Sequence, residues 1–206
     1  IFHLGMSGTI HMVKKKINKI TNLSFYQKKQ LPNKHNHIRL FFSNFKIIYN
    51  DPRRFGFFKL FNNTNDLNLY FKNLGPEPFN KKFTFNYLVN KIKNKKKNIK
   101  NILLDQNIIS GLGNIYVNEI LFYSKIDPKK KGVELSKDEI HKIIKYSKLV
   151  LKLAIKFGGS SIRDFKSTEG KQGSFQKEFK IYKKNGENCY RNNCKGKIIK
   201  FFQTNR

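Results

Sequence analysis

The chain has 206 residues, enough to bury a hydrophobic core in one large domain or in two to three small ones. Its 43 lysines and arginines outnumber 13 acidic residues, so the formal charge is +30 and we expect a polyanionic partner. A hydrophobic content of 38% excludes a disordered basic tail, two cysteines exclude a disulfide-dense secreted scaffold, and no apolar run reaches the length of a membrane span.

The charge has a second explanation. Lys, Asn, Ile and Phe are used heavily, as expected from an AT-rich genome, so compositional drift accounts for part of the lysine excess. Drift does not account for arginine, which is scarce and confined to a few places. The stretch from Ile1 to Leu4 is typical of a strand cut in its middle, and we expect an internal piece of a longer protein.

The first part of the chain is predicted to be β. Ile38–Phe42 and Lys46–Tyr49 flank a short turn and predict a hairpin, and Phe55–Phe61 predicts a further strand. Residues 14–36, rich in Lys and Asn, are expected to form a long loop. The segment Leu74–Pro78 contains two prolines and a glycine, which predicts a stiff boundary.

Helical spacing follows this boundary. Apolar residues from Phe85 to Ile92 repeat at i, i+3, i+4 and i+7, and residues 99–105 and the run to about Tyr123 predict further helices. A capping box at Ser136–Glu139 starts a long helix that Gly158 ends. Residues 160–175 are predicted to be mobile, and residues 178–206 to form short strands around the cysteines.

The segment Asn50–Gly56 is the most informative in the chain. It contains Arg53, Arg54 and Phe55 directly after a predicted strand. Arginine binds phosphate or the edge of an orphaned base, and an aromatic ring can wedge between stacked bases. This turn therefore favours an interaction with a nucleic-acid duplex.

The remaining patterns are ambiguous by themselves. The turn Gly111–Asn114 either brings a helix N-terminus to a phosphate, with Lys95 and Lys100 nearby, or is an ordinary corner between helices. Cys189 and Cys194 are either half of a zinc site or two free thiols. Met6 between glycines is either a core residue or a functional one, and the pair His35 and His37 could bind metal, bind phosphate or lie on a strand edge.

Together and in this order, the motifs resemble the bacterial formamidopyrimidine-DNA glycosylase family, over essentially the whole chain. The resemblance rests on these segments: His3–Gly8, Lys34–His37, Asp51–Gly56, Leu74–Pro78, Leu103–Gln106, Gly111–Glu119 and the cysteine pair. The related endonuclease VIII family generally lacks the Asp51–Gly56 pattern.

The resemblance implies an α+β multidomain protein. The expected parts are a partial β-sandwich domain (1–73), a linker (74–82), a helix-two-turn-helix DNA-binding domain (83–160), a lesion-capping loop (161–177) and a truncated β-hairpin zinc finger (178–206). It also implies a bacterial, cytoplasmic, monomeric protein whose partner is double-stranded DNA with oxidised purines or abasic sites.

The resemblance also implies roles for individual residues. Met6, Arg53 and Phe55 would fill the space left by an extruded nucleotide. His35, Lys95, Lys100 and Asn114 would contact the DNA backbone, Cys189 and Cys194 would ligate one structural Zn²⁺, and Arg206 would act in δ-elimination.

The implied activity is base-excision repair by a glycosylase and abasic-site lyase. The family nucleophile is an N-terminal proline, which attacks the sugar C1′, expels the oxidised base and forms a Schiff base before β,δ-elimination. We expect that proline, its neighbouring glutamate and the second cysteine pair outside this chain, and therefore no activity from the piece itself. Asn36 in place of aspartate and the four-residue cysteine spacing depart from the family pattern.

Two alternatives stay open. A decayed homologue would bind damaged DNA with a steep salt dependence and form no covalent adduct. A basic RNA-binding protein would leave the particular placement of Arg53, Phe55 and Asn114 unexplained.

Overall fold

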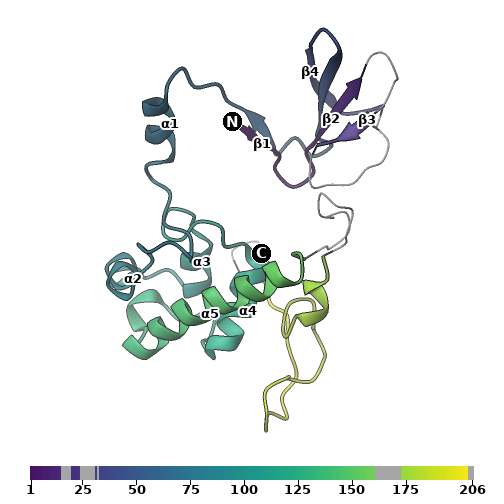
Figure 1. Ribbon diagram of the computed structural model, residues 1–206. Coiled ribbons are helices and arrows are strands. Elements are labelled where there is room, and N and C mark those ends of the chain that lie inside the picture. The colour runs from purple at the N-terminus through teal and green to yellow at the C-terminus, as the bar shows by residue number, and fades with distance from the viewer. Residues whose placement is uncertain (15–19, 24–30, 32, 161–172, 204–206) are drawn as a thin grey trace. The chain divides into compact units, whose positions relative to one another are not determined.

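The computed structural model describes residues 1–14, 20–23, 31, 33–160 and 173–203, and its elements are labelled in Figure 1. The chain forms two compact units. The first comprises Ile1–Leu69 and Phe157–Gln176, and the second comprises Tyr70–Lys156 and Lys177–Arg206. The described residues 157–160 and 173–176 are grouped with the strands, and the described residues from 177 on are grouped with the helices. Most of the expected lesion-capping loop (161–177) lies outside the described residues.

The first unit contains two antiparallel sheets. In the larger sheet the strand order is β3-β2-β5-β4, and β2 buries every second residue, Thr9, His11 and Val13. This alternation places one face of the sheet against a core. The strands are β1 (Phe2–His3), β2 (Thr9–Lys14), β3 (Ile20–Asn22), β4 (Asn36–Phe41), β5 (Phe45–Asn50) and β6 (Phe57–Phe58), and β1 pairs with β6.

The predicted hairpin is confirmed, since β4 and β5 pair in antiparallel register around Phe42–Asn44. The predicted strand Phe55–Phe61 is wrong in length: β6 spans two residues because β1 offers only Phe2 and His3 as partners. The long loop at 14–36 is wrong where it contains β3, which pairs with β2. Much of that loop lies outside the described residues.

The second unit is helical. Its core consists of fully buried aliphatic side chains, each of which contributes about 1.5–3 kcal/mol, including Leu88, Ile92, Ile99, Leu103, Leu112, Ile120 and Ile143. Helices α4 and α5 pack along each other (Figure 1). The helices are α1 (Thr64–Phe71, which the boundary between the units divides), α2 (Phe85–Ile92), α3 (Ile99–Leu104), α4 (Asn114–Ser124) and α5 (Lys137–Lys156), with short 3₁₀ turns at Gly132–Glu134 and Phe175–Glu178.

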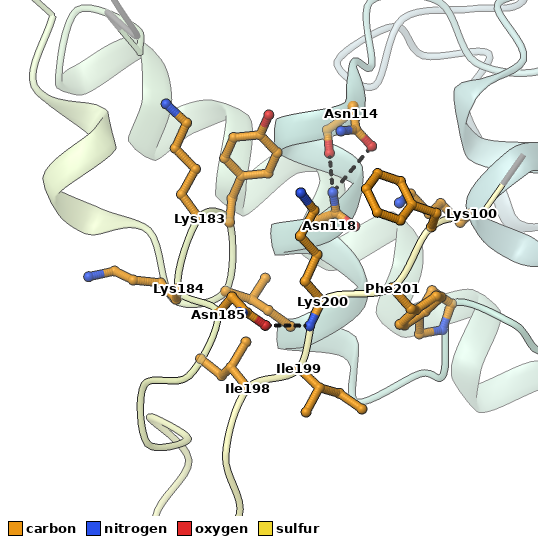
Figure 2. A pocket seen from close by; sticks show the side chains of 14 residues that line it. Lys100, Asn114, Asn118, Lys183, Lys184, Asn185, Ile198, Ile199, Lys200 and Phe201 are labelled. Atoms are coloured by element: carbon orange, nitrogen blue, oxygen red, sulfur yellow. Dashed lines mark hydrogen bonds between the residues drawn. The ribbon is translucent and has the colours of Figure 1, made fainter. Parts of the chain in front are cut away.

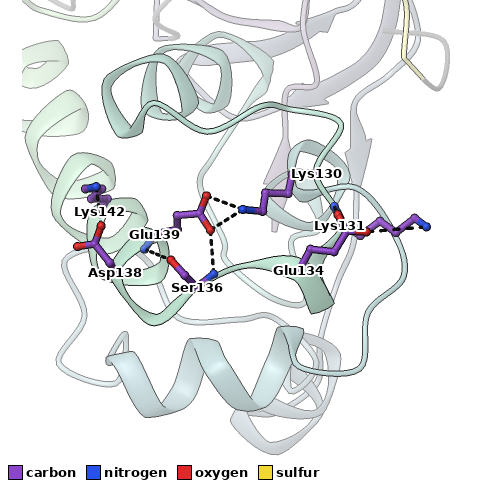
Figure 3. Close-up of polar contacts among 7 residues, drawn as sticks. All are labelled: Lys130, Lys131, Glu134, Ser136, Asp138, Glu139 and Lys142. Carbon is purple, nitrogen blue, oxygen red and sulfur yellow. Dashed lines mark hydrogen bonds and ion pairs between the residues drawn. The ribbon is translucent and has the colours of Figure 1, made fainter.

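The predicted capping box at the start of α5 is confirmed (Figure 3). The Ser136 N–H donates to the Glu139 carboxylate at 2.8 Å, and the Glu139 N–H donates to Ser136 Oγ at 3.2 Å. Lys130 Nζ also donates to both Glu139 oxygens, at 2.7 and 2.8 Å. Burial alone would raise the pKa of Glu139, but these bonds outweigh burial and lower it.

The C-terminal segment departs from its prediction. Within the described part, residues 178–203 contain no regular strand, and only the isolated bridge between Asn188 and Lys197 has strand pairing. None of the described helices is long and apolar enough to cross a membrane.

Candidate nucleic-acid interface

Three exposed side chains of the first unit form one cluster, although they come from two separate loops. The Arg53 guanidinium lies 3.7 Å from Met6 Sδ and 4.6 Å above the centre of the Phe55 ring. Met6 is 61% exposed and Phe55 is 54% exposed, so both side chains are open to solvent. We call Met6, Arg53 and Phe55 the insertion cluster.

A buried carboxylate holds the two loops of the insertion cluster together. Asp51 is fully buried and accepts four hydrogen bonds. Oδ1 accepts from Ser7 Oγ at 2.5 Å and from the Arg53 N–H at 3.3 Å. Oδ2 accepts from Tyr49 Oη at 2.9 Å and from the Gly56 N–H at 2.8 Å. Asp51 therefore orders the turn that presents the cluster.

The hydrogen bonds to Asp51 keep it ionised. Burial by itself would raise the pKa of Asp51, but the donors from Ser7, Gly56, Tyr49 and Arg53 outweigh burial and lower it. The pKa of Tyr49 is raised, first by burial and then by its bond to the Asp51 carboxylate. The turn is thus built around a fixed negative charge.

Glycines let the two loops approach each other. Gly5 has a φ of +60°, and a Cβ there would lie 2.7 Å from the Phe55 carbonyl carbon. A Cβ on Gly56 would lie 1.8 Å from Tyr49 Oη. Both positions require glycine because neighbouring atoms occupy the space of a side chain.

His35 is exposed on a neighbouring turn. Its carbonyl accepts from the Asp51 N–H at 3.0 Å, so the turn is tied directly to the loop of the insertion cluster. Asn50 Nδ2 donates to the Lys34 carbonyl at 2.6 Å and to Asn36 Oδ1 at 3.0 Å. Asn36, which departs from the family pattern, thus supplies the acceptor oxygen that an aspartate would also supply.

In the second unit, the N-terminus of α4 is open to a ligand. Its N-cap is Gly113, which has no side-chain cap, and a Cβ at Gly113 would meet no atom within 4 Å. Gln106 holds the preceding loop, since its Oε1 accepts from the Gly111 N–H at 2.9 Å and its Nε2 donates to the Leu112 carbonyl at 2.9 Å. The backbone N–H groups of a first helical turn and the helix dipole favour an anion at such a position.

A cavity of about 410 Å³ joins this helix end to the C-terminal segment (Figure 2). Lys100 and Asn114 both line it, and Asn118 Nδ2 donates to the Asn114 carbonyl at 2.7 Å. The C-terminal segment adds Tyr182 and further lysines, Lys183, Lys184 and Lys200. The cavity therefore combines amide groups and cations with apolar side chains, which include Ile198, Ile199 and Phe201.

Glu119 of α4 fixes the C-terminal segment in this position. Its side chain is 1% exposed, and its oxygens accept from the backbone N–H groups of Lys180 at 2.9 Å, Ile181 at 3.1 Å and Tyr182 at 2.9 Å. Near the other end of the helix, Arg191 Nη2 donates to the Phe122 carbonyl at 2.7 Å, and its guanidinium lies 4.5 Å from the Phe122 ring centre. One helix thus presents an uncapped N-terminus and anchors the C-terminal segment.

The cysteines lie on facing sides of a tight turn. The Cys189 N–H donates to the Gly196 carbonyl at 2.8 Å. The pKa of Cys194 is lowered, first by a hydrogen bond with the Gly196 backbone and then by the Cys189 side chain. Two thiols in contact fit half of a tetrahedral zinc site. Among the described residues, no group of three or more His, Cys, Asp or Glu side chains could hold a metal.

Two expected site residues lie apart from these groups. Lys95 is half-buried in the turn after α2, does not line the cavity, and contributes its carbonyl to the Val133 N–H at 3.2 Å. Arg206 lies outside the described residues.

Comparison with known proteins decides the family. The family model described as the formamidopyrimidine-DNA glycosylase N-terminal domain matches residues 1–58, and the H2TH domain of the same family matches residues 74–166. The formamidopyrimidine-DNA glycosylase of Roseobacter denitrificans is 38% identical over 208 residues, covering 100% of this chain and 72% of that protein. The protein of the same name from Rickettsia africae is 39% identical, and the match covers 100% of this chain and 70% of that protein. The chain belongs to the formamidopyrimidine-DNA glycosylase family.

Solved structures of formamidopyrimidine-DNA glycosylases agree with the expected architecture. A Lactococcus lactis enzyme variant in complex with Fapy-dG-containing DNA is 33% identical, with a TM-score of 0.80. MutM in complex with carbocyclic 8-oxo-G-containing DNA is 35% identical, also with a TM-score of 0.80. Each alignment covers 100% of this chain and 70% of the other. The predicted combination of an N-terminal sheet domain with a helix-two-turn-helix domain is confirmed.

Sequence reasoning assigned no role to Asp51 and Glu119, although both lie in motifs that carry the resemblance, and each organises a group of candidate residues in its own unit. Both are among the few acids of a strongly basic chain. Asp51 is followed by proline within a turn, and Glu119 lies among apolar residues of a helix, where an unpaired charge would be costly. An acid in such a setting indicates buried donors, although the sequence does not reveal which ones.

Proposed function

We propose that the protein acts in DNA base-excision repair as a glycosylase and abasic-site lyase that removes oxidised purines such as 8-oxoguanine and formamidopyrimidines. The insertion cluster is the observation that carries the proposal. Met6, Arg53 and Phe55 are exposed, Arg53 contacts both of the others, and a buried carboxylate holds their loops, in a chain of the glycosylase family.

The chemistry of the cluster suits a duplex from which one nucleotide has been extruded. Extrusion removes stacking and pairing, which costs a few kcal/mol. Met6 would fill the vacated space, Arg53 would donate hydrogen bonds to the orphaned partner base, and Phe55 would wedge at the neighbouring step. Because Asp51 already orders the turn, little entropy is lost when the side chains insert.

Backbone phosphates would bind at the open end of α4 and in the adjoining cavity. Asn114 and the uncapped N-terminus of α4 would offer donors to one phosphate, and Lys100 and Lys200 would offer cations beside it. His35 would contact a phosphate from the first unit. Glu119 acts as a positioning residue because it holds the backbone beside Tyr182.

The bond-breaking steps are proposed for the complete protein. An N-terminal proline nitrogen would attack C1′ as the bond to the oxidised base breaks, the base leaving with a proton and the amine losing its own. Cleavage of the C1′–O4′ bond with protonation of O4′ would then give the iminium, and β- and δ-elimination would release the two phosphates and cut the strand on both sides. We assign Arg206 to the phosphate beside the lesion in the δ-step. The described residues would prepare the DNA for these steps.

We further propose that Cys189 and Cys194 supply two of four ligands to one structural Zn²⁺, and that two further ligands complete the site. The neighbouring thiols and the lowered pKa of Cys194 support this, since thiolates are the binding form. Metal analysis of the complete protein tests it. We expect one zinc per chain, absent from a Cys189→Ser, Cys194→Ser variant, and retention of zinc by that variant would contradict the assignment.

The central test alters the insertion cluster in the complete protein. Arg53→Ala with Phe55→Ala should lower the preference for an 8-oxoguanine duplex over an undamaged duplex by about 10- to 100-fold, because stacking of one base on a side chain is worth about 1–3 kcal/mol. A matched control replaces Arg39 and Phe41, which are exposed on β4 and outside the cluster. The control should keep the lesion preference.

Borohydride trapping on the same duplex separates repair from binding alone. The proposal requires a covalent adduct with the complete protein. Lesion binding without an adduct would identify a DNA-binding homologue instead, and an unchanged lesion preference in the Arg53, Phe55 variant would exclude the insertion cluster as its source.

A further inference from the structure

The second unit has another cavity, of about 710 Å³, beside the linker Leu74–Pro78. Residues on both sides of Leu74–Pro78 along the chain line it: Lys72 and Asn73 precede this segment, and Lys82 and Lys91 follow it. Neither Lys100 nor Asn114 lines this cavity, so it is separate from the phosphate-facing end of α4. We call it the linker pocket.

The walls of the linker pocket are firmly held. The Gly75 N–H donates to the Gln106 carbonyl at 2.8 Å, and a Cβ on Gly75 would lie 2.3 Å from the Ile108 carbonyl oxygen. Tyr87, which also lines the pocket, donates its hydroxyl to the same Ile108 carbonyl at 2.9 Å. The linker and α2 are thus both fastened to the loop before α4, and the pocket is preformed.

All charged side chains that line the linker pocket are positive. Its lining contains three lysines, Lys72, Lys82 and Lys91, and no acidic side chain. Within the described part of the chain, none of these lysines forms an ion pair, whereas Lys130, Lys131, Lys142 and Lys184 of the same unit each contact a carboxylate. Three like charges around one space repel each other, and a bound anion would relieve that repulsion.

Neutral donors complete the lining. Asn73, Asn80 and Asn107 line the pocket, and Asn80 Oδ1 accepts from the Lys82 N–H at 2.9 Å, which leaves its NH₂ group for a ligand. Lys91 Nζ lies 5.7 Å from the Tyr87 ring centre. Ammonium and amide donors without a carboxylate form the set that binds phosphate oxygens.

We propose that the linker pocket is a second phosphate-binding site, outside the lesion interface, which takes a phosphodiester of the DNA backbone. The proposal rests on the DNA-binding function proposed above. A phosphate bound there would contact Lys72 on one side of the linker and Lys82 or Lys91 on the other. It would therefore join the two ends of Leu74–Pro78 and restrain the linker when DNA is bound.

Compositional drift is the competing explanation for these lysines, and a matched control separates the two. The pocket variant is Lys72→Gln, Lys82→Gln, Lys91→Gln. The control variant is Lys145→Gln, Lys148→Gln, Lys152→Gln, which removes the same charge from exposed positions of α5 that line neither cavity. The control also removes one lysine stacked near a tyrosine, since Lys145 Nζ lies 5.6 Å from the Tyr146 ring centre.

The first arm titrates inorganic pyrophosphate into the labelled complete protein and follows amide resonances by NMR. We expect shifts at the side chains of Asn73, Asn80 and Asn107 that persist in the control variant and vanish in the pocket variant. Shifts spread evenly over the lysine-bearing surface, or pocket shifts that survive the three substitutions, would overturn the proposal.

The second arm measures binding of a lesion-free 40-base-pair duplex against salt concentration. Removing one phosphate interaction lowers the slope of log K against log salt by about 0.9. A pocket variant with a slope reduced by about 1–3 relative to the control identifies the DNA backbone as the ligand. Equal slopes of log K against log salt in the two variants would overturn the assignment to the DNA backbone. If the pyrophosphate-induced NMR shifts nevertheless vanish in the pocket variant, the ligand is a free oxyanion. Lesion preference, which depends on the insertion cluster, is measured in parallel and should be the same in both variants.

Discussion

Replacing Asp51 by asparagine tests whether a buried charge organises the insertion cluster. The side chain keeps its shape, but an amide has one acceptor oxygen, so two of the four donors around Asp51 would face an NH₂ group. The hydroxyls of Ser7 and Tyr49 can rotate to accept from this group. The N–H groups of Arg53 and Gly56 cannot.

The size of the effect follows from these bonds. A hydrogen bond to a charged group contributes about 1.5–3 kcal/mol and a neutral one about 1 kcal/mol, so weakening two bonds and breaking one or two costs about 3 kcal/mol. Local opening of the loops should then become roughly 100-fold more frequent. Hydrogen exchange read by mass spectrometry over residues 3–8 and 51–57 measures this opening directly and suits a chain without tryptophan.

A pH series tests whether the stabilisation comes from the ionised form of Asp51. The folded pKa of Asp51 is lowered, so its contribution is complete above the unfolded value of about 3.9 and disappears as the pH falls through the folded value. Asp51→Asn should remove this acid-dependent loss of protection in the two loops. The control, Asp66→Asn, changes an exposed carboxylate of the same unit and should cost less than about 1 kcal/mol. Equal effects of both substitutions, or unchanged protection in Asp51→Asn, would refute the reasoning.

Further predictions concern helix α4. Glu119→Gln places an NH₂ group against at least one of three backbone donors. We therefore expect the free energy of unfolding to fall by about 2 kcal/mol and hydrogen exchange at residues 180–182 to become faster. Unchanged exchange at these residues would contradict the positioning role of Glu119. Arg191→Ala removes the bond to the Phe122 carbonyl and the packing against its ring, worth about 2–3 kcal/mol together. Limited proteolysis should then cut the chain around Cys189 and Cys194 sooner than in the parent, and Arg191→Lys should restore less than half of the resistance, because an ammonium lacks the planar fork of the guanidinium.

The sequence predicts those elements whose signals are local. The capping box at Ser136–Glu139 and the apolar spacing of α2 and α5 depend on residues a few positions apart, and these helices occur where expected. Helix α1 has no such signal, because none of its residues from Thr64 to Phe71 is buried and no apolar face repeats along it. Only Asn63, whose Oδ1 accepts from the Asp66 N–H at 2.9 Å, hints at a helix start.

The rest of the site depends on contacts between distant residues. The ordered motifs identify Met6, Arg53 and Phe55 as candidate site residues. The contacts of Arg53 with the other two depend on Asp51, whose hydrogen-bond partners are 2 to 44 residues away along the chain. Short strands were expected after residue 178 because the composition permits them. The position of the segment instead depends on its backbone N–H groups, which donate to Glu119, and on Arg191, which donates to the Phe122 carbonyl. These partners lie 61 to 69 positions apart along the chain, and no local pattern encodes such pairing.

The net charge of the chain and the side chains of the insertion cluster have different consequences for DNA binding. A formal +30 attracts any polyanion and speeds encounter, and its effect falls with salt. It has no means of distinguishing an oxidised base from a normal one, since both lie on the same phosphate backbone. Discrimination requires side chains that replace the missing stacking and pairing at one position, and the insertion cluster offers a sulfur, a guanidinium and a ring in contact. Removing exposed lysines such as Lys148 or Lys152 should therefore change affinity and its salt dependence equally for damaged and undamaged duplexes, whereas removing Phe55 should change their ratio.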